Sequence, residues 1–504
     1  MKEHRCRLFV EPSGPFTADH AERELARLAN PSERVDWVTP DGGCLSLIVP
    51  PTVYPPREDT SLLAEVLHEA GWPAGLEWLE IGVGSGAISV FAAQQGCKVT
   101  ACDINPLAVA ATTANLSKHG CTGRVHEGGP GPVCDGLLTQ WGGDRLYDRV
   151  VWNLPYLPSP DEDEPHLGPL EEASLIDTDS LGLYRRFIMA VKRGELLNQH
   201  GAAYVVVSSR YDGQQACEHA WMVGLAAKVC RSRRFDDGEE LFVVRLWRPF
   251  SNSLMLELET IASTNTHLLG QDSPVGTTLR VEHQTGGRGR RGRVWDNTSQ
   301  AMLASWVVSA GSSEPHQTLD QVRVGGALVR LLQAISVQPD RVCLKWPNDV
   351  FVRSTEDGGW RKAAGVLFEA RTQGNLTRVV LGIGLNTQPS LEKTYGSLRD
   401  IGCDASPTEL HRMIHAMVAS LYELNGTASL YGGSEFASLQ VLVQLGEQHL
   451  GPIIYRGEPS KISGLHSTGE LWLNDGHLIG DDPEQIEWLN TEFSIEDAFS
   501  ITGS

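Results

Sequence analysis

The chain lacks several features that mark particular classes of protein. Nowhere do its 504 residues contain a run of about 18 apolar side chains, the length needed to cross a bilayer, and the first residues lead into no secretory signal. No two of the ten cysteines have the Cys-x-x-Cys spacing of many zinc and redox sites. We therefore expect a cytoplasmic protein with reduced cysteines, without a membrane anchor, a disulfide framework or a bound structural metal.

Basic charge is also scarce. The chain has 42 Lys and Arg residues against 63 Asp and Glu residues, a formal net charge of −21 that is spread over both halves. This balance argues against a protein that holds nucleic acid by charge alone. Internal repeats and long low-complexity segments are absent too. The length of the chain suits two to four globular domains.

The first half alternates short β-rich runs with helical stretches. We predict strands at 76–81, 98–103, 148–153, 202–208 and 240–247, with a helix at 214–227 and a charged turn at 231–239 before the last strand. Such alternation is typical of an α/β fold with a mostly parallel sheet and crossover helices. Residues 248–253 are interpreted as a linker.

The second half has a different pattern. A mixed α+β region extends from 254 to 440 and includes a helix at 319–335 with a period near 3.6. From 441 to 490, short strands alternate with turn signals, which favours a small β-barrel. The predicted domains are therefore 1–248, 254–440 and 441–490.

A glycine-rich turn follows the first predicted strand. Gly82, Gly84 and Gly86 come directly after Leu79-Glu80-Ile81, where missing side chains let a ligand approach the backbone. About twenty residues later the next strand ends at Asp103, which can accept hydrogen bonds from the two hydroxyls of a ribose. The pair predicts a nucleotide or nucleoside site.

A second motif, Asn153-Leu154-Pro155-Tyr156, follows a later apolar strand. An Asn side-chain oxygen and a backbone carbonyl can accept both hydrogens of a planar –NH2 group while the Tyr ring packs on its face. That geometry suits methylation of an amide or an exocyclic amine, because both hydrogen bonds direct the nitrogen lone pair toward the methyl donor. An ordinary proline turn with a packing tyrosine is the alternative.

These motifs, with Val53-Tyr54-Pro55-Pro56-Arg57-Glu58-Asp59-Thr60, resemble class I methyltransferases of the HemK type over about residues 45–215. The resemblance implies a Rossmann-like domain that methylates a release-factor glutamine with S-adenosylmethionine, with or without a small activator subunit. Asn153 and Tyr156 would bind the acceptor amide. The residues implied for S-adenosylmethionine are Thr60, Glu80, Gly82, Gly84, Gly86, Asp103, Asp135 and Asn153.

One residue departs from the family pattern. HemK-type enzymes usually have Pro where this chain has Leu154, a form familiar from adenine dimethyltransferases of ribosomal RNA. The acceptor is therefore either a protein glutamine, favoured by the Glu-Asp-Thr segment, or an adenine in RNA. A third alternative is a catalytically silent docking module.

The second half contains an arginine-glycine loop, Gln284-Thr285-Gly286-Gly287-Arg288-Gly289-Arg290-Arg291-Gly292-Arg293. Guanidinium groups on a flexible loop can hold phosphate and carboxylate oxygens. Alone, the loop would also suit an RNA-binding tract, which would make the whole chain an RNA-modifying enzyme.

Further motifs precede and follow that loop in a fixed order: Ser263-Thr264-Asn265, Lys345-Trp346-Pro347-Asn348-Asp349, Lys362 to Glu369, and Gly382-Ile383-Gly384-Leu385-Asn386. Their order resembles the biotin protein ligases over residues 257–390, with a capping barrel at 441–480. The resemblance implies that biotin and ATP form biotinyl-adenylate, which a lysine of a biotin carboxyl carrier protein then attacks. Mg²⁺ would bridge the phosphates.

The resemblance assigns roles to particular residues. Lys362 and Arg290 would be catalytic, since cations must neutralise the reacting carboxylate and phosphate. The residues implied for biotin and the adenylate are Ser263, Thr264, Asn265, Gln284, Gly287, Arg288, Arg290, Trp295, Lys345, Asn348, Asp349, Lys362, Gly365, Gly384 and Asn386. We expect no DNA binding, because no recognition-helix pattern precedes Leu254, and the resemblance allows a homodimer.

Overall fold

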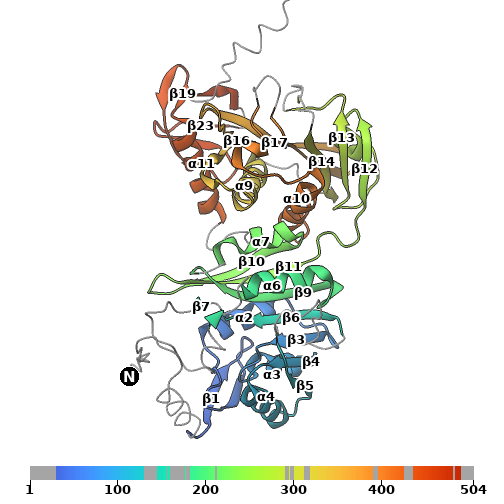
Figure 1. Ribbon diagram of the computed structural model, residues 1–504, viewed down its shortest axis with the longest axis vertical. Helices are drawn as coiled ribbons and strands as arrows, with labels where there is room; N and C mark the ends of the chain where they lie inside the picture. The colour runs from blue at the N-terminus through green and yellow to red at the C-terminus, as the bar shows by residue number, and fades with distance from the viewer. Residues whose placement is uncertain are drawn as a thin grey trace, which may run out of the picture. The chain divides into compact units, whose positions relative to one another are not determined.

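The computed structural model describes residues 30–129, 145–155, 157–158, 176–177, 182–210, 213–289, 295, 300–311, 318–389, 395–424, 435–480 and 483–489. The chain divides into two compact units (Figure 1). The first unit comprises 1–217 with 228–248, and the second comprises 218–227 with 249–504. Among the described residues, no helix has the length and apolar character needed to cross a membrane.

The first unit contains a seven-stranded sheet in the order β10-β11-β9-β6-β3-β4-β5. Its strands are β3 (Glu77–Ile81), β4 (Lys98–Asp103), β5 (Gly123–Glu127), β6 (Tyr147–Asn153), β9 (Leu197–Ser208), β10 (Ala226–Arg234) and β11 (Glu240–Trp247). The five strands from β5 to β9 are parallel, and β11 is antiparallel to β9. The predicted α/β fold with a mostly parallel sheet is confirmed.

Strand β10 corrects the predicted end of a helix and the charged turn after it. Helix α7 (Ala216–Val223), preceded by a 3-10 turn (Gly213–Gln215), is shorter than predicted, and β10 begins at Ala226. Basic side chains hide the strand pattern because they are paired with acids of another element: Arg231 donates to Glu65 at 2.8 Å and to Glu69 at 2.6 Å. Only the tertiary contact explains why so charged a segment is a strand.

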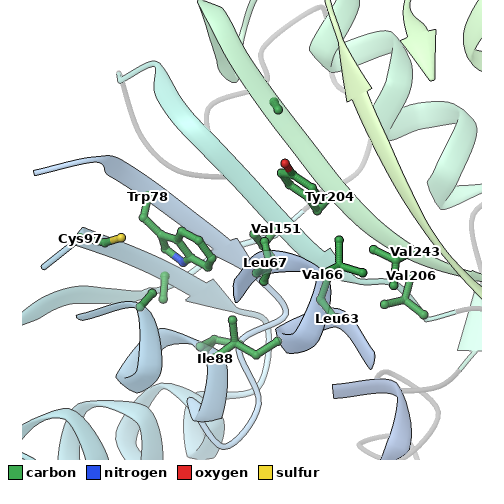
Figure 2. Close-up of a cluster of buried hydrophobic side chains, with 14 of the residues drawn as sticks. Leu63, Val66, Leu67, Trp78, Ile88, Cys97, Val151, Tyr204, Val206 and Val243 are labelled. Atoms are coloured by element: carbon green, nitrogen blue, oxygen red, sulfur yellow. The ribbon is translucent and has the colours of Figure 1, made fainter. Parts of the chain in front are cut away.

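Helices cover both faces of this sheet. The helices are α2 (Glu58–Glu69), α3 (Ala87–Gln94), α4 (Pro106–Lys118) and α6 (Leu183–Arg193); β1 (Glu33–Val38) pairs with β2 (Cys44–Val49), and β7 (Leu157–Pro158) with β8 (Ile176–Asp177). Figure 2 shows Leu63 and Leu67 of α2 packed with Val151 of β6. Each such buried side chain contributes about 1.5–3 kcal/mol. Trp152, the next residue of β6, contacts Phe187 of α6 on the opposite face.

The second unit also has a seven-stranded sheet, in the order β12-β13-β14-β18-β17-β16-β15. Its strands are β12 (Met255–Ile261), β13 (Thr278–Gln284), β14 (Ala301–Gly311), β15 (Val342–Lys345), β16 (Asp349–Arg353), β17 (Trp360–Gln373) and β18 (Leu376–Asn386). Strands β12 and β13 are parallel. All neighbouring pairs from β13 across the sheet to the edge strand β15 are antiparallel. The predicted mixed α+β region is confirmed.

Successive residues of β14 show how helices flank this sheet. Ser305 donates hydrogen bonds to α8 (Thr264–Leu269), whereas the Trp306 indole donates to His415 of α10 (Pro407–Tyr422) at 3.1 Å. Because neighbouring residues of a strand point to opposite faces, α8 and α10 lie on opposite sides. The remaining helices are α9 (Thr318–Ala334), α11 (Glu435–Leu450) and the 3-10 turns Pro339–Arg341, Leu398–Ile401 and Pro483–Gln485.

The last strands form two small sheets of three strands each. One contains β19 (Ile453–Tyr455), β20 (Glu458–Ser460) and β24 (Ile486–Trp488), and the other β21 (Ile462–Leu465), β22 (Leu471–Leu473) and β23 (Leu478–Ile479). The two sheets are compatible with a small barrel but do not close one within the described residues, so the barrel stays a prediction. The expected boundary between 440 and 441 lies inside α11.

Candidate functional site

The glycine turn after β3 needs the conformational freedom of glycine. Gly82, Gly84 and Gly86 have φ values of 63°, 54° and 80°, in the left-handed region. A Cβ at Gly86 would also lie 2.8 Å from the Oγ1 of Thr112, the residue whose hydroxyl donates to the Gly84 carbonyl at 3.1 Å. The turn, which connects β3 to α3, is therefore packed tightly against α4.

Asp103 faces this turn from the end of β4. One carboxylate oxygen accepts the backbone N–H of Gly84 at 2.9 Å, and the other accepts that of Asn105 at 2.8 Å. Burial raises the pKa of Asp103 above its usual value, although these backbone donors oppose the shift. The bonds hold the carboxylate at the same edge as the glycine turn, as a ribose site requires.

Glu80 and Thr60, two further residues predicted for this site, make hydrogen bonds to other residues of the protein. Glu80 is buried and accepts a hydrogen bond from Ser89 of α3 at 2.5 Å, and burial raises its pKa to about 8. Thr60, in the first turn of α2, accepts the backbone N–H of Arg57 and donates to Asp59. In this structure both predicted residues act within the protein's own hydrogen-bond network.

Asn153, at the end of β6, is held in one orientation by Asp59. Its Nδ2 donates to Asp59 Oδ2 at 2.9 Å. An ionised carboxylate can only accept hydrogen bonds, so the Asn153 amide must turn its nitrogen toward Asp59 and its oxygen away. That oxygen, Oδ1, is buried and has no hydrogen-bond partner among the described residues. A buried acceptor without a partner is costly unless a ligand donates to it.

Asp59 is a candidate site residue that the sequence patterns did not reveal. It is 4% exposed and also accepts the backbone N–H of Thr60 at 2.6 Å. Its neighbour Thr60 was assigned instead, because the contact with Asn153 joins residues 94 positions apart. The two other residues predicted near this site, Asp135 and Tyr156, lie outside the described residues.

In the second unit, Trp295 lies flat against two glycines of adjacent strands. Gly365 of β17 is directly opposite Gly384 of β18. A Cβ at either position would come within 2.8 Å of the Trp295 ring. The Trp295 indole N–H is buried and has no hydrogen-bond partner among the described residues. The glycines therefore make room for an aromatic ring that keeps a donor available.

Lys362 lies beside the same ring. Its Nζ is 2.7 Å from Asp349 Oδ1 and 5.0 Å from the Trp295 ring centroid. Lys362 and Asp349 come from the adjacent strands β17 and β16, and a register shift occurs between them. A cation, an acid and an indole donor thus meet on one part of the sheet.

A polar network connects α8 to the sheet. Gln284 Oε1 accepts the Thr264 backbone N–H at 3.0 Å, and the Ser305 hydroxyl lies 2.6 Å from Thr264 Oγ1 and 2.5 Å from Asn265 Oδ1. Asn265 Nδ2 donates to Glu369 at 2.8 Å. Ser305 and Glu369 were missed by the sequence analysis, because their partners lie about 40 and 104 residues away in the chain.

The arginine-glycine loop is described in part. Trp295 donates its backbone N–H to the Gly287 carbonyl at 3.0 Å, and Arg288 lies 3.9 Å from Glu369. Arg290, predicted to be catalytic, lies outside the described residues. Ser263 begins α8, where its hydroxyl accepts the Thr266 backbone N–H. The loop thus starts next to the network formed by Gln284, Asn265 and Glu369.

The other predicted residues lie around this centre. Lys345 is opposite Asp349 in the sheet, and its Nζ lies 5.0 Å from the Phe351 ring centroid. Asn348 donates to the Val366 carbonyl at 2.8 Å, and Asn386 is buried. These side chains hold the strand ends in place. Among the described residues, no three His, Cys, Asp or Glu side chains cluster as a metal site.

Comparisons with known proteins bear on the two units separately. The model of the biotin/lipoate A/B protein ligase family matches residues 258–386. The bifunctional ligase/repressor BirA of Escherichia coli is 31% identical over 260 residues, which cover 48% of this chain and 74% of that protein. The biotin–[acetyl-CoA-carboxylase] ligase of Mycobacterium tuberculosis is 36% identical over 162 residues, 30% of this chain and 57% of that ligase.

Other relatives match the first unit. The release factor glutamine methyltransferase of Geobacter sulfurreducens is 33% identical over 164 residues, 31% of this chain and 54% of that enzyme.

Among solved structures, an Aquifex aeolicus biotin protein ligase variant with biotin aligns over 47% of this chain and 99% of its own, at 20% identity and a TM-score of 0.36.

The chain spans a little over half the length of the first curated relatives it matches. The comparison with the Escherichia coli protein is broader and, with the family model, places the second half in one family. The chain therefore belongs to the biotin/lipoate A/B protein ligase family, fused behind a HemK-type methyltransferase domain.

Proposed function

We propose that the chain is a bifunctional enzyme whose second half attaches biotin to a lysine of a carrier-protein domain. The observation that carries this proposal is the cluster of Lys362, Asp349 and Trp295 on the glycine pair of β17 and β18. Its donors are the Lys362 ammonium group, which is paired with Asp349, and the Trp295 indole N–H, and both suit ligands rich in oxygen and negative charge.

The chemistry explains the need for those donors. Attack of the biotin carboxylate on the α-phosphate of ATP brings two anions together, and a cation lowers the repulsion. Lys362 would contact the carboxylate and phosphate oxygens, and Thr264, Asn265 and Gln284 would orient biotin. Mg²⁺ bound to the ATP phosphates would supply further positive charge. The product, biotinyl-adenylate, then acylates a lysine amine of the carrier and releases AMP.

Replacement of Lys362 tests this proposal. A Lys362→Ala variant of the full chain should form biotinyl-adenylate at least about 100-fold more slowly, since a charge contact to the transition state is lost. Biotin-dependent pyrophosphate release measures this step. A Lys461→Ala variant, which removes an exposed lysine of the same unit, serves as the control. Equal rates in the Lys362→Ala variant and the unaltered chain would refute the assignment.

For the first half we propose N-methylation of a glutamine side-chain amide in a peptide-release factor. The observation that carries it is Asn153 Oδ1, a buried acceptor that Asp59 orients away from itself. S-adenosylmethionine would supply the methyl group when bound along the glycine turn and Asp103. The acceptor amide would donate one N–H to Asn153 Oδ1, which fixes its plane and directs the nitrogen lone pair.

A labelling experiment tests the acceptor. The purified chain is incubated with methyl-labelled S-adenosylmethionine and either a release factor with a Gly-Gly-Gln segment or ribosomal RNA. Label on the glutamine supports the proposal, and label on adenine moves the first half to RNA modification. Label on neither, with a small activator subunit also supplied, would favour the silent docking module.

The partners and domains of this proposal follow from the two activities. We propose a biotin carboxyl carrier domain for the ligase half, and a release factor with an activator subunit for the methyltransferase half. The domains would be 1–248, 254–440 and 441–490. A cytoplasmic location, a homodimer and the absence of DNA binding stay predictions from the sequence.

A further inference from the structure

A hollow of about 880 Å³ lies at the edge of the second unit's sheet, and the residues that line it include none of Lys362, Asp349 and Trp295. It is lined by the 3-10 turn before β15, the end of β16, the start of β17 and the end of α11. A cavity of this volume is large enough for a small organic ligand. The described residues that line it include Arg341, Arg353, Trp360 and His449.

Two arginines come together in this hollow. Val342 of β15 is opposite Val352 of β16, so Arg341 and Arg353, one position further on each segment, are neighbours. Trp360 of β17 is opposite Arg353 on its other side. Arg341 belongs to the 3-10 turn before β15 and Arg353 to β16, and both line the hollow. Two like charges in one hollow repel each other, which favours the binding of an anion there.

The protein does not supply that anion from its own described residues. Arg341 Nη1 is buried and has no hydrogen-bond partner, and the guanidinium of Arg353 donates to a single carbonyl, that of Gly358 at 2.9 Å. Two carboxylates also line the hollow. Asp357 is paired with Arg361 and accepts the Gly359 backbone N–H, whereas Asp340 makes no contact that neutralises Arg341.

Another pair of arginines in the same sheet shows the usual arrangement. Arg371 of β17 is opposite Arg378 of β18. There the Arg378 guanidinium donates to Asp272 at 2.8 Å and to the Ser273 carbonyl at 2.5 Å. An acid of the chain thus neutralises Arg378, whereas among the described residues no acid is paired with Arg341 or Arg353.

We propose that the hollow binds a small phosphate-bearing molecule, with Arg341 and Arg353 as its anion clamp. Two adjacent guanidinium groups present parallel N–H donors that match the oxygens of a phosphate. Lys362 lies two residues along β17 from Trp360, roughly 7 Å at the rise of a strand, but no residue of the Lys362 cluster lines the hollow. This site is therefore separate from the adenylation site and goes beyond the proposed function.

Calorimetric titration of the full chain with inorganic phosphate, at constant ionic strength, tests the proposal. We expect one site whose affinity falls at least about 10-fold in Arg341→Gln and in Arg353→Gln variants. The matched control, Arg371→Gln, should keep its affinity within about 2-fold, because that arginine lies outside the hollow. Retained binding in a Lys362→Ala variant would further support a site distinct from the ligase centre.

The proposal would be overturned by an absence of phosphate binding, by binding that both arginine variants leave unaffected, or by binding that is lost in Lys362→Ala. Titration with succinate tests the phosphate class, since equal affinity for a dicarboxylate would refute it. Titration with AMP distinguishes a nucleotide from free phosphate as the ligand. Binding of either ligand supports the proposal if the Arg341→Gln variant abolishes that binding. Arg353 is exposed, so its variant carries the test should Arg341→Gln fail to fold.

Discussion

The two candidate sites leave opposite kinds of polar atom without a partner. In the first unit the buried atom is an acceptor, Asn153 Oδ1, and in the second it is a donor, the Trp295 indole N–H beside Lys362. A site that lacks donors suits a ligand with an –NH2 group, and a site that lacks acceptors suits an oxygen-rich anion. We therefore infer the polarity of each ligand from the polar atoms that its site leaves without a partner.

The sites also differ in what fixes them. In the first, one carboxylate, Asp59, orients one amide, so a single side chain carries the specificity. In the second, paired glycines create a flat surface, and a network of several side chains supports it. We therefore expect the first site to be more sensitive to a change in hydrogen-bond polarity and the second to a change in shape.

The largest expected effect is that of Asp59→Asn on methyl transfer. An Asn at position 59 can donate as well as accept, so the Asn153 amide can turn over and present its nitrogen to the acceptor. We expect kcat to fall by about 10² to 10³, comparable to the loss of one transition-state hydrogen bond. The measurement is single-turnover methylation, with S-adenosylmethionine affinity expected to stay within about 3-fold.

A reciprocal exchange sharpens this test. The double variant Asp59→Asn with Asn153→Asp restores a donor facing an acceptor and keeps an acceptor toward the substrate, so we expect at least about a 10-fold recovery over either single variant. Glu58→Gln, at an exposed neighbouring acid, is the control. If Asp59→Asn retains kcat within about 3-fold, Asp59 does not orient Asn153.

The next largest effect is that of Gly384→Ala on adenylation. The added Cβ would lie 2.8 Å from the Trp295 ring, so the ring must move. A displacement of about 1 Å in a catalytic site can lower the rate about 100-fold. Biotin-dependent pyrophosphate release measures the rate, and indole fluorescence reports the displacement. In the control, Gly311→Ala, the Cβ meets no atom within 4 Å, so activity should not change.

The two units should also respond oppositely to acid. In the first, burial raises the pKa of Glu80 to about 8, so its contribution to the free energy of unfolding is largest below about pH 4.5 and is lost as the pH rises toward 8. In the second, burial lowers the pKa of His411 to about 3 and of His415 to about 4. Their contribution is present above about pH 6.5 and is lost as the pH falls below it.

Hydrogen exchange at pH 7 and pH 5 measures this difference, with intrinsic exchange rates corrected at each pH. We expect β3 and β9 to gain about 1–2 kcal/mol at pH 5 and β14 and β18 to lose about 2 kcal/mol. Glu80→Gln should remove the first trend, and His415→Gln should reduce the second. Parallel changes in both units would contradict the assignment of these buried groups.

The smallest effect is expected for Glu369→Gln. A Gln oxygen can still accept the Asn265 hydrogen bond, and only the charge near Arg288, 3.9 Å away, is lost. We expect the KM for biotin to change by about 3-fold or less, as for weakly coupled charge pairs. A 100-fold rise in KM would show that this second-unit network, like Asp59 in the first, depends on one carboxylate.

Much of the fold follows from local patterns. The strands Lys98–Asp103 and Glu240–Trp247 have the predicted bounds, and the helix predicted at 319–335 spans 318–334. These segments combine apolar periodicity with clear turn signals at their ends. Strand β10 could not be predicted in the same way, because Arg231 is stabilised there by Glu65 and Glu69 of α2.

The sequence by itself determined the order of the motifs, the α/β and α+β character of the two halves and the residue types of both sites. These are properties of neighbouring residues, and local spacing is enough to reveal them. The tertiary structure decided the rest: that Asp59 orients Asn153, that Gly365 and Gly384 support Trp295, and that Arg341 and Arg353 line one hollow. Each depends on strands or helices that meet only in the folded chain, where burial makes an unpartnered polar atom costly.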